Sequence, residues 1–208
     1  MRRKPNLDSR IEKCAHLLVA RPEALRGQWL REFGRDELFI EIGCGKGRFT
    51  AEAAKASPGA LFAAFEKTAN VMVIALERAE REGLRNVRFV NAYAEGLAEC
   101  FAPGEASRIY LNFCDPWPSN RHAKRRLTAP GFLEKYSQIL RPGGEIRLKT
   151  DNLPFFEYSL REFQRCGFAL SGVVRDLHKN GTVGAMTDYE LKFYGQGLPI
   201  YQCTVSRP

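Results

Sequence analysis

The segment Asn112-Phe113-Cys114-Asp115-Pro116-Trp117-Pro118 places a carboxylate and an indole directly after an apolar run. The run Ile109–Phe113 is typical of a buried strand, and the prolines after it prevent further ladder hydrogen bonds. Open α/β sheets bind their ligands at the ends of strands. Asp115 is therefore a candidate catalytic residue, because a carboxylate in a partly dry pocket stabilises positive charge. A turn followed by solvated charges explains each residue separately, but not all of them together.

A basic run follows this segment: Arg121-His122-Ala123-Lys124-Arg125-Arg126. The net charge of +8 is unevenly distributed, since residues 119–149 contain eight Lys/Arg against two Asp/Glu and residues 1–35 contain nine against four. The rest of the chain is therefore slightly acidic. Concentrated positive charge is expected where a polyanion such as a nucleic acid binds.

Three glycines, at positions 43, 45 and 47, lie between the apolar run Leu38–Ile42 and an alanine-rich stretch that predicts a helix over Phe49–Ala56. Strand, glycine turn and helix form the first unit of a nucleotide-binding α/β fold. A dinucleotide fingerprint requires glycine at position 48, which is Arg48, so a dehydrogenase is disfavoured. The spacing from Glu41 is E-x-G-x-G-x-G, the S-adenosylmethionine pattern, in which glycines let the backbone approach the amino-acid part of the cofactor. A glycine turn without a ligand is the simpler alternative.

Two further strand ends supply candidate cofactor contacts. Glu66 follows the apolar run Leu61–Phe65 and lies 25 residues after Glu41, near the spacing at which a strand-end acid binds ribose hydroxyls. A third predicted strand, Val87–Val90, leads into the loop that contains Tyr93. In this fold that loop usually flanks the adenine.

The rest of the chain continues the alternation of strands and helices. Helices are expected over 68–82, around 132–140 and over 155–166, and strands over 145–150, 168–174 and 200–205. The sequence predicts an α/β fold with a doubly wound, mostly parallel seven-stranded sheet. Residues 37–208 form one predicted domain. Residues 1–36 form a basic N-terminal arm with a weak helix, and for the first ten residues a disordered tail is an equal alternative.

The composition is that of one globular domain, with 44% hydrophobic and 27% charged residues. No apolar run reaches the roughly 18 residues of a membrane helix, and the N-terminus has no signal-peptide core. We therefore expect a cytoplasmic protein without a membrane partner. Six cysteines without a Cys-x-x-Cys pair and three isolated histidines predict reduced thiols and no metal site.

Over nearly its whole length, the chain closely resembles the tRNA (guanine-N7-)-methyltransferase family. The resemblance extends from Glu41–Gly47 to Thr187–Glu190, and its most specific parts are Asn112–Pro118 with Arg121–Leu127, and Lys149–Asn152. It implies a Rossmann-like class I methyltransferase that transfers the methyl group of S-adenosyl-L-methionine to N7 of a variable-loop guanine, position 46, in tRNA. A monomer or a homodimer is expected.

The resemblance also assigns roles to single residues, with Asp115 central to catalysis. The implied cofactor contacts are Glu41, Gly43, Gly45, Glu66, Tyr93 and Asp115. The implied substrate contacts are Ser119, Asp151, Thr187, Asp188, Tyr189 and Glu190. The implied tRNA contacts are Arg121, His122, Lys124, Arg125 and Arg126.

The sequence departs from the family pattern at three places. Ser119 and Asn120 stand where lysines are common, so a contact to substrate is weakened or supplied elsewhere. Tyr93 stands where Asp or Asn is usual, and Asp188 where Glu or Lys is more usual. None of these changes affects Asp115.

Guanine N7 carries a lone pair and no proton, so its methylation needs alignment and charge stabilisation rather than a general base. We expect Asp115, aided by Asp151 and Glu190, to accept hydrogen bonds from the guanine N1–H and exocyclic amine, with Trp117 stacking or forming a wall. A guanine in folded tRNA must first be exposed or turned out. Two alternatives are a methyltransferase of the same fold with a small-molecule or protein substrate, and an RNA-binding protein that has lost catalysis.

Overall fold

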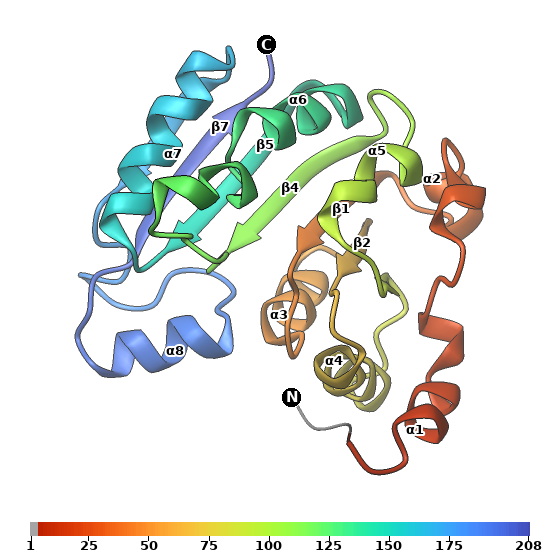
Figure 1. The fold of residues 1–208 in the computed structure, drawn as a ribbon. Coiled ribbons are helices and arrows are strands. Elements are labelled where there is room, and N and C mark those ends of the chain that lie inside the picture. Colours follow the sequence, from red (N-terminus) through yellow and green to blue (C-terminus); the bar gives the residue numbers. More distant parts are fainter. Residues whose placement is uncertain (1–3) are drawn as a thin grey trace.

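The computed structural model describes residues 4–208, which form a seven-stranded sheet with helices on both faces (Figure 1). The strand order is β3-β2-β1-β4-β5-β7-β6, and only β7 runs antiparallel to its neighbours. This confirms the predicted doubly wound, mostly parallel sheet. The strands are β1 Glu37–Ile42, β2 Ala60–Phe65, β3 Val87–Val90, β4 Ala106–Asn112, β5 Leu140–Thr150, β6 Ala169–Val174 and β7 Tyr201–Ser206.

Helices cover the sheet in two layers, with α3 and α4 on one face and α5, α6 and α7 on the other (Figure 1). The α-helices are α1 Leu7–Lys13, α2 Trp29–Phe33, α3 Arg48–Ala56, α4 Ala69–Arg81, α5 Leu97–Cys100, α6 Pro130–Ile139, α7 Leu153–Arg165 and α8 Asp188–Gly195. Short 3-10 helices are η1 Ala15–Leu17, η2 Pro22–Leu25, η3 Ala94–Gly96 and η4 Asn120–Arg125.

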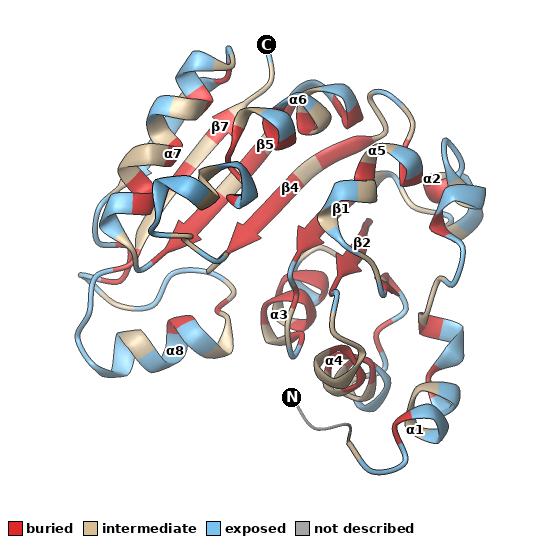
Figure 2. Ribbon diagram, viewed as in Figure 1, coloured by how far each residue is buried: buried red, intermediate tan, exposed pale blue. Residues whose placement is uncertain are grey.

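The central strands β1 and β2 are mostly apolar because both of their faces are buried (Figure 2). Alternate residues face the two layers. Phe39 and Phe62 pack with the core formed by α3 and α4, whereas Ile40 and Leu61 belong to the core on the opposite face. This alternation explains why the strands appear in the sequence as continuous apolar runs.

The N-terminal segment packs along the β3 edge of the sheet. Arg10 of α1 donates from Nε and Nη2 to the Glu77 carboxylate, each at 2.6 Å. The Val19 amide donates to the Phe89 carbonyl at 2.9 Å, and the fully buried Trp29 donates from Nε1 to the Cys100 carbonyl at 3.0 Å. The segment is thus ordered structure from Leu7 onward, while positions 1–3 of the predicted arm lie outside the described residues.

Strands β1 to β5 are mutually parallel, so their carboxyl ends lie at one edge of the sheet. The residues that emerge there are Gly43, Glu66, Asn91, Phe113 and Asp151. This edge carries several of the candidate site residues predicted from the sequence. Strand β5 begins at Leu140, five residues before the predicted start. Leu140 pairs with Ala106 of β4, the register then shifts, and continuous pairing with β4 starts at Glu145, which is the predicted start.

Candidate active site

The glycine loop after β1 bends back over the end of the sheet. Gly43, Gly45 and Gly47 have φ values of 80°, 59° and 73°, in the left-handed region that favours glycine. A Cβ at Gly47 would lie 2.6 Å from the Ala75 Cβ, so this glycine is required for packing against α4. At Gly43 and Gly45 no atom lies within 4 Å of such a Cβ. These two glycines therefore border open space where a ligand can approach the backbone.

Glu66 lies beside this loop with a fixed carboxylate. Its Oε2 accepts a hydrogen bond from the Gly45 amide at 3.2 Å, and its Oε1 accepts one from the Thr68 amide at 2.9 Å. The Asn91 Nδ2 donates to the Glu66 backbone carbonyl at 2.7 Å and links the ends of β2 and β3. Because a carboxylate has about four acceptor sites, Glu66 keeps capacity for hydroxyl donors such as those of a ribose.

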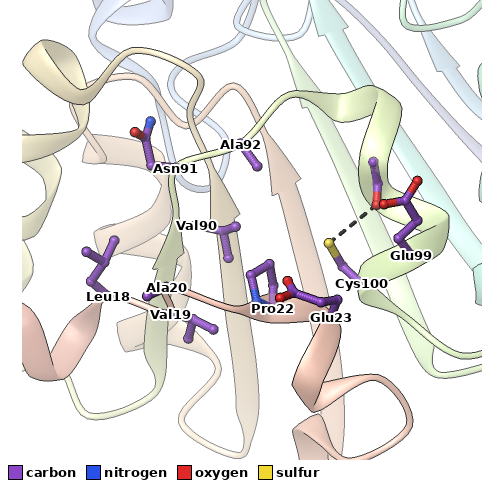
Figure 3. A pocket seen from close by; sticks show the side chains of 11 residues that line it. Leu18, Val19, Ala20, Pro22, Glu23, Val90, Asn91, Ala92, Glu99 and Cys100 are labelled. Carbon is purple, nitrogen blue, oxygen red and sulfur yellow. Dashed lines mark hydrogen bonds between the residues drawn. The ribbon is translucent and has the colours of Figure 1, made fainter.

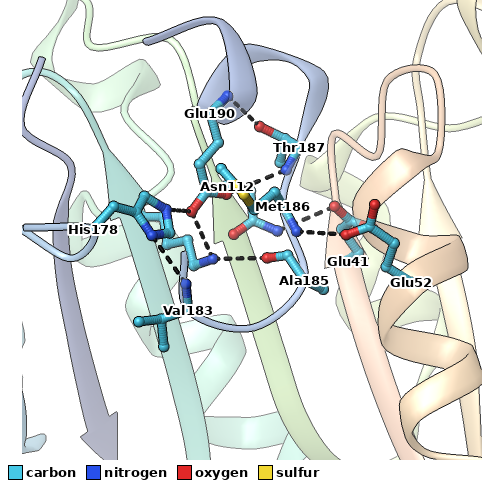
Figure 4. A network of polar contacts seen from close by, with 10 residues as sticks. Glu41, Glu52, Asn112, His178, Val183, Ala185, Met186, Thr187 and Glu190 are labelled. Atoms are coloured by element: carbon cyan, nitrogen blue, oxygen red, sulfur yellow. Dashed lines mark hydrogen bonds and ion pairs between the residues drawn. The ribbon is translucent and has the colours of Figure 1, made fainter. Parts of the chain in front are cut away.

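Glu41 lies beneath the loop and is almost completely buried. Its Oε2 accepts from Thr50 Oγ1 at 2.5 Å. Its Oε1 accepts from Asn112 Nδ2 at 3.2 Å (Figure 4). Burial raises the pKa of Glu41 to about 7, against the opposing effect of these two hydrogen bonds. Within residues 4–208, the buried Oδ1 of Asn112 has no hydrogen-bond partner. Acceptors of this kind fit a cationic or hydrogen-bond-donating ligand group, so the residues present are compatible with an amino-acid-bearing cofactor.

The loop after β4 holds Asp115 in an exposed position between two residues with unusual backbone geometry. Phe113 and Trp117 have φ values of 51° and 43°, a conformation that is costly for bulky side chains and concentrates at functional sites. The Phe113 ring stacks on Phe193 of α8, with 6.1 Å between the ring centroids. The Trp117 ring meets His122 at a centroid distance of 5.7 Å. Contacts on both sides thus hold the Asp115 turn.

Glu190 is completely buried within a polar network (Figure 4). Its Oε1 lies 2.9 Å from Lys149 Nζ and 2.8 Å from His178 Nε2, and its Oε2 accepts from the Thr187 amide at 3.2 Å. The Val183 amide donates to His178 Nδ1 at 3.1 Å, so His178 Nε2 carries the proton that Glu190 accepts. Thr187 Oγ1 accepts from the Glu190 amide and completes a capping box at the start of α8.

A family model described as "Putative methyltransferase" matches residues 35–203. The tRNA (guanine-N(7)-)-methyltransferase of Geobacillus kaustophilus (strain HTA426) is 47% identical over 210 residues, which cover 100% of this chain and 97% of that protein. The chain belongs to the tRNA (guanine-N7-)-methyltransferase family. A second member, from Bacillus subtilis (strain 168), is 42% identical over 207 residues, 99% of this chain and 97% of that protein. The solved 16S rRNA methyltransferase KamB has the same fold, with a TM-score of 0.66 and 18% identity over 89% of this chain and 91% of that one.

Two residues that were expected to contact the substrate are buried in the structure. Glu190 was expected to bind the guanine, but both of its oxygens are used inside the protein. Arg126 was expected to contact tRNA, but it is only 8% exposed and donates to the Pro116 and Trp117 carbonyls. Each of these two side chains stabilises a neighbouring segment of the protein.

The other predicted substrate contacts of the family lie nearer to solvent. Asn152, and not Asp151, caps α7 by accepting from the Phe155 amide at 2.9 Å, so the exposed Asp151 carboxylate is not used as a cap. Tyr189, in the first turn of α8, is 65% exposed. Ser119 is exposed, Thr187 is the N-cap of α8, and Asp188 lies 4.0 Å from Arg78 Nη2.

The other expected tRNA contacts, and the residue expected on the adenine side, are also accessible. Arg121, Lys124 and Arg125 of η4 are exposed, and His122 is half-buried. Tyr93 is 65% exposed after β3. Lys149 and His178 were missed as site residues. Lys149 lies in a specific family motif, whereas His178 gave no signal beyond being an isolated histidine.

A cavity of about 350 Å³ lies between residues 18–23, the end of β3 and α5 (Figure 3). Its lining is mostly apolar, with Glu23 and Glu99 at its border, and it includes Asn91. None of the predicted site residues lines it. The predicted site residues therefore lie outside this cavity, on the open edge over Gly43 and Asp115.

Residues 4–208 contain no group of three or more histidine, cysteine, aspartate or glutamate side chains placed to hold a metal ion. In the same range, no helix is both long and apolar enough to cross a bilayer. The Cys114 thiol next to Asp115 has its pKa raised to about 12 by desolvation, with a smaller effect of the Asp115 charge. This thiol is therefore protonated at neutral pH and is a poor nucleophile.

We expect the cofactor-free Glu41→Gln variant to become more stable than the parent protein as the pH rises. The pKa of Glu41 is raised from 4.5 to about 7 in the folded state, so its contribution to stability is complete below pH 4.5 and is lost as the pH rises through 7. A glutamine avoids this loss, and its amide can donate to Thr50 while its oxygen accepts from Asn112. The advantage of the variant should grow by roughly 2–3 kcal/mol between pH 5 and pH 8. Urea unfolding at both pH values measures it, and a difference independent of pH would contradict the expectation.

Proposed function

We propose that this protein is an enzyme that transfers the methyl group of S-adenosyl-L-methionine to N7 of a variable-loop guanine, position 46, in tRNA. The observation that carries the proposal is the exposed Asp115, held between left-handed Phe113 and Trp117 at the sheet edge that also carries the glycine loop. Relatives named for this activity, at 42–47% identity over essentially the whole chain, support it. We further propose that it acts in the cytoplasm, as a monomer or homodimer.

The cofactor, when bound, supplies an electrophilic methyl group on a positively charged sulfur. Gly43 and Gly45 present open backbone to its amino-acid part, and Glu66 has acceptor capacity for its ribose. Glu41 and Asn112 supply buried acceptors for its ammonium group. Tyr93 replaces the usual carboxylate or amide on the adenine side, so an aromatic ring takes the place of a side-chain hydrogen bond there.

The residues of the guanosine side act by orientation and charge. No side chain has to remove a proton from N7, so the contribution of the protein is to align N7 with the methyl carbon, an effect of up to roughly 7–11 kcal/mol in favourable systems. Asp115 and the exposed Asp151 accept from the guanine N1–H and exocyclic amine. Their negative charge stabilises the positive charge that develops on the purine. Tyr189 and Trp117 offer aromatic faces for stacking.

The tRNA backbone is bound by the exposed cations of η4. Replacing Arg121 and Lys124 together by glutamine should reduce the slope of log K against log salt by about two, because each lost phosphate contact releases about one counterion fewer. The loss of affinity should be the same for different tRNAs, since phosphate contacts do not read sequence. Filter binding over a salt series measures it. The matched control is the double variant Arg81→Gln/Arg161→Gln, with substitutions on α4 and α7. Its slope of log K against log salt should equal that of the parent protein.

The proposed activity is tested by incubation with methyl-labelled cofactor and unmodified tRNA. Reduction and aniline cleavage then map 7-methylguanosine, which we expect at a single variable-loop position. A tRNA with adenine at that position should remain unlabelled. Label in another nucleotide would assign another substrate atom. Normal tRNA binding without label transfer or cofactor binding would favour an RNA-binding protein that has lost catalysis.

A further inference from the structure

Two adjacent arginines at the end of η4 have opposite environments. Arg125 is exposed, and its Cζ lies 5.0 Å from the centroid of the Trp117 ring. Arg126 is only 8% exposed, and its Cζ lies 4.3 Å from the centroid of the Tyr158 ring. The sequence alone gives no reason to separate them, because both belong to one basic run.

The backbone explains the difference. Residues up to Arg125 form the 3-10 helix η4, whereas Arg126 has the extended conformation, with φ −63° and ψ 132°. Its amide still donates to the Ala123 carbonyl at 3.1 Å, and its own carbonyl accepts from Ala129 at 2.9 Å. The chain thus leaves the helix at Arg126 and turns this side chain inward, toward α7.

The buried guanidinium binds the turn that carries Asp115. Arg126 Nε lies 3.0 Å from the Pro116 carbonyl oxygen and 3.2 Å from that of Trp117, and Nη2 lies 2.9 Å from the Trp117 oxygen. These carbonyls belong to the two residues that directly follow Asp115. Trp117 has φ 43°, and a bulky residue keeps such a conformation only when its surroundings fix it. The planar fork of arginine can hold two neighbouring carbonyls at once, which the ammonium of lysine cannot do in the same geometry.

We propose that Arg126 is a positioning residue that holds the Asp115–Trp117 turn, with Trp117 in its left-handed conformation, and so fixes the Asp115 carboxylate against the guanine. Arg125, and not Arg126, contacts the tRNA. The proposal rests on the proposed function for its kinetic consequences, but the geometry of the turn can be followed without any activity.

The test compares matched single substitutions, Arg126→Met, Arg126→Lys and Arg125→Met, with Arg161→Met on α7 as a control for the lost charge. Arg126→Met should lower kcat by about 10–100-fold, as expected when a catalytic group is misplaced. The KM for tRNA and the salt slope of tRNA binding should remain unchanged. Arg126→Lys should give an intermediate kcat. Arg125→Met should instead raise the KM and reduce the salt slope by about one.

Acrylamide quenching of tryptophan fluorescence gives a readout that needs no methyl transfer. Trp29 is 0% exposed, so the quenching reports on Trp117. Arg126→Met should increase the quenching constant, because the turn loosens. If the parent protein fails to methylate tRNA, this result still decides whether Arg126 holds the turn.

Two results would overturn the proposal. A lower salt slope with unchanged kcat in Arg126→Met would make Arg126 an ordinary tRNA contact. If a folded Arg126→Lys variant has the kcat and the quenching constant of the parent protein, the two-carbonyl contact of the guanidinium is not required to hold the turn. Should Arg126→Met not fold, Arg126→Lys decides by itself, since it keeps the charge and most of the stem, and a reduced kcat at an unchanged melting temperature supports the positioning role.

Discussion

Asp115→Asn is expected to lower kcat for tRNA methylation by about 100-fold or more, the scale seen when one charge-stabilising group is removed from an active site. Asparagine keeps the size of the side chain and can occupy the same exposed place between Phe113 and Trp117. It lacks the negative charge, and its amide group is a donor where the guanine N1–H and amine also donate. The stabilisation of the developing purine charge is therefore lost while the fold is retained.

Single-turnover rates with saturating cofactor and tRNA measure this effect, and filter binding measures the Kd for tRNA. The Kd should change by less than about threefold, because the phosphate contacts of η4 are intact. Asp36→Asn is the matched control, since Asp36 is exposed at the amino end of β1, on the opposite edge of the sheet. Full methyl transfer by Asp115→Asn with normal tRNA binding would show that Asp115 is not central to the reaction.

Glu190→Gln is expected to release α8 from the body of the protein. The substitution leaves the Lys149 ammonium buried without its carboxylate, and breaking one partner of a buried ion pair typically costs about 3–5 kcal/mol. The Ala185 carbonyl, 2.9 Å from Lys149 Nζ, and the glutamine side-chain oxygen remain as acceptors for that ammonium, but both are neutral, and His178 Nε2 competes for the glutamine oxygen. Because α8 lies at the surface, we expect the loss as local opening, with amide exchange in α8 faster by about 100-fold or more.

Hydrogen exchange followed by mass spectrometry measures this opening, with α6 as the internal control that should not change. The double variant Lys149→Met/Glu190→Gln removes both charges and should recover most of the protection, because replacing both members of a buried pair is often neutral. Equal exchange in the single and double variants would show that the charge pair does not hold α8.

The fold was predictable because local and long-range signals agree. The strand β3 has the predicted bounds, and β1 and β2 begin one residue before theirs. The glycine loop follows a buried strand and precedes an alanine-rich helix, which leaves few alternatives to a nucleotide-binding unit. The same reasoning missed α5, since four residues are too few to show a helical period.

The position of the candidate site residues at the strand ends was predictable, but the direction of each side chain was not. Glu190 is buried because Lys149, 41 residues earlier, and His178 both reach it, and no local pattern encodes such a meeting. The separation of Arg125 from Arg126 depends on one backbone step at the end of a 3-10 helix. The left-handed Phe113 and Trp117 have no sequence signal, because the residues that favour this conformation are Gly and Asn.

The position of α8 between β6 and β7 has a consequence for engineering. The first half of the chain supplies the glycine loop and Glu66, whereas Asp151, Tyr189 and the other residues proposed for the guanosine side come from the second half. The excursion 175–199 thus lies on an edge hairpin, and it is attached to the body through Lys149, the Phe113–Phe193 stack and the hydrogen bond from the Met186 amide to Glu52 of α3. A library that varies the exposed positions of this excursion but keeps Met186, Glu190, His178 and Phe193 is expected to alter which nucleotide is accepted while the contacts to the first half of the chain stay in place.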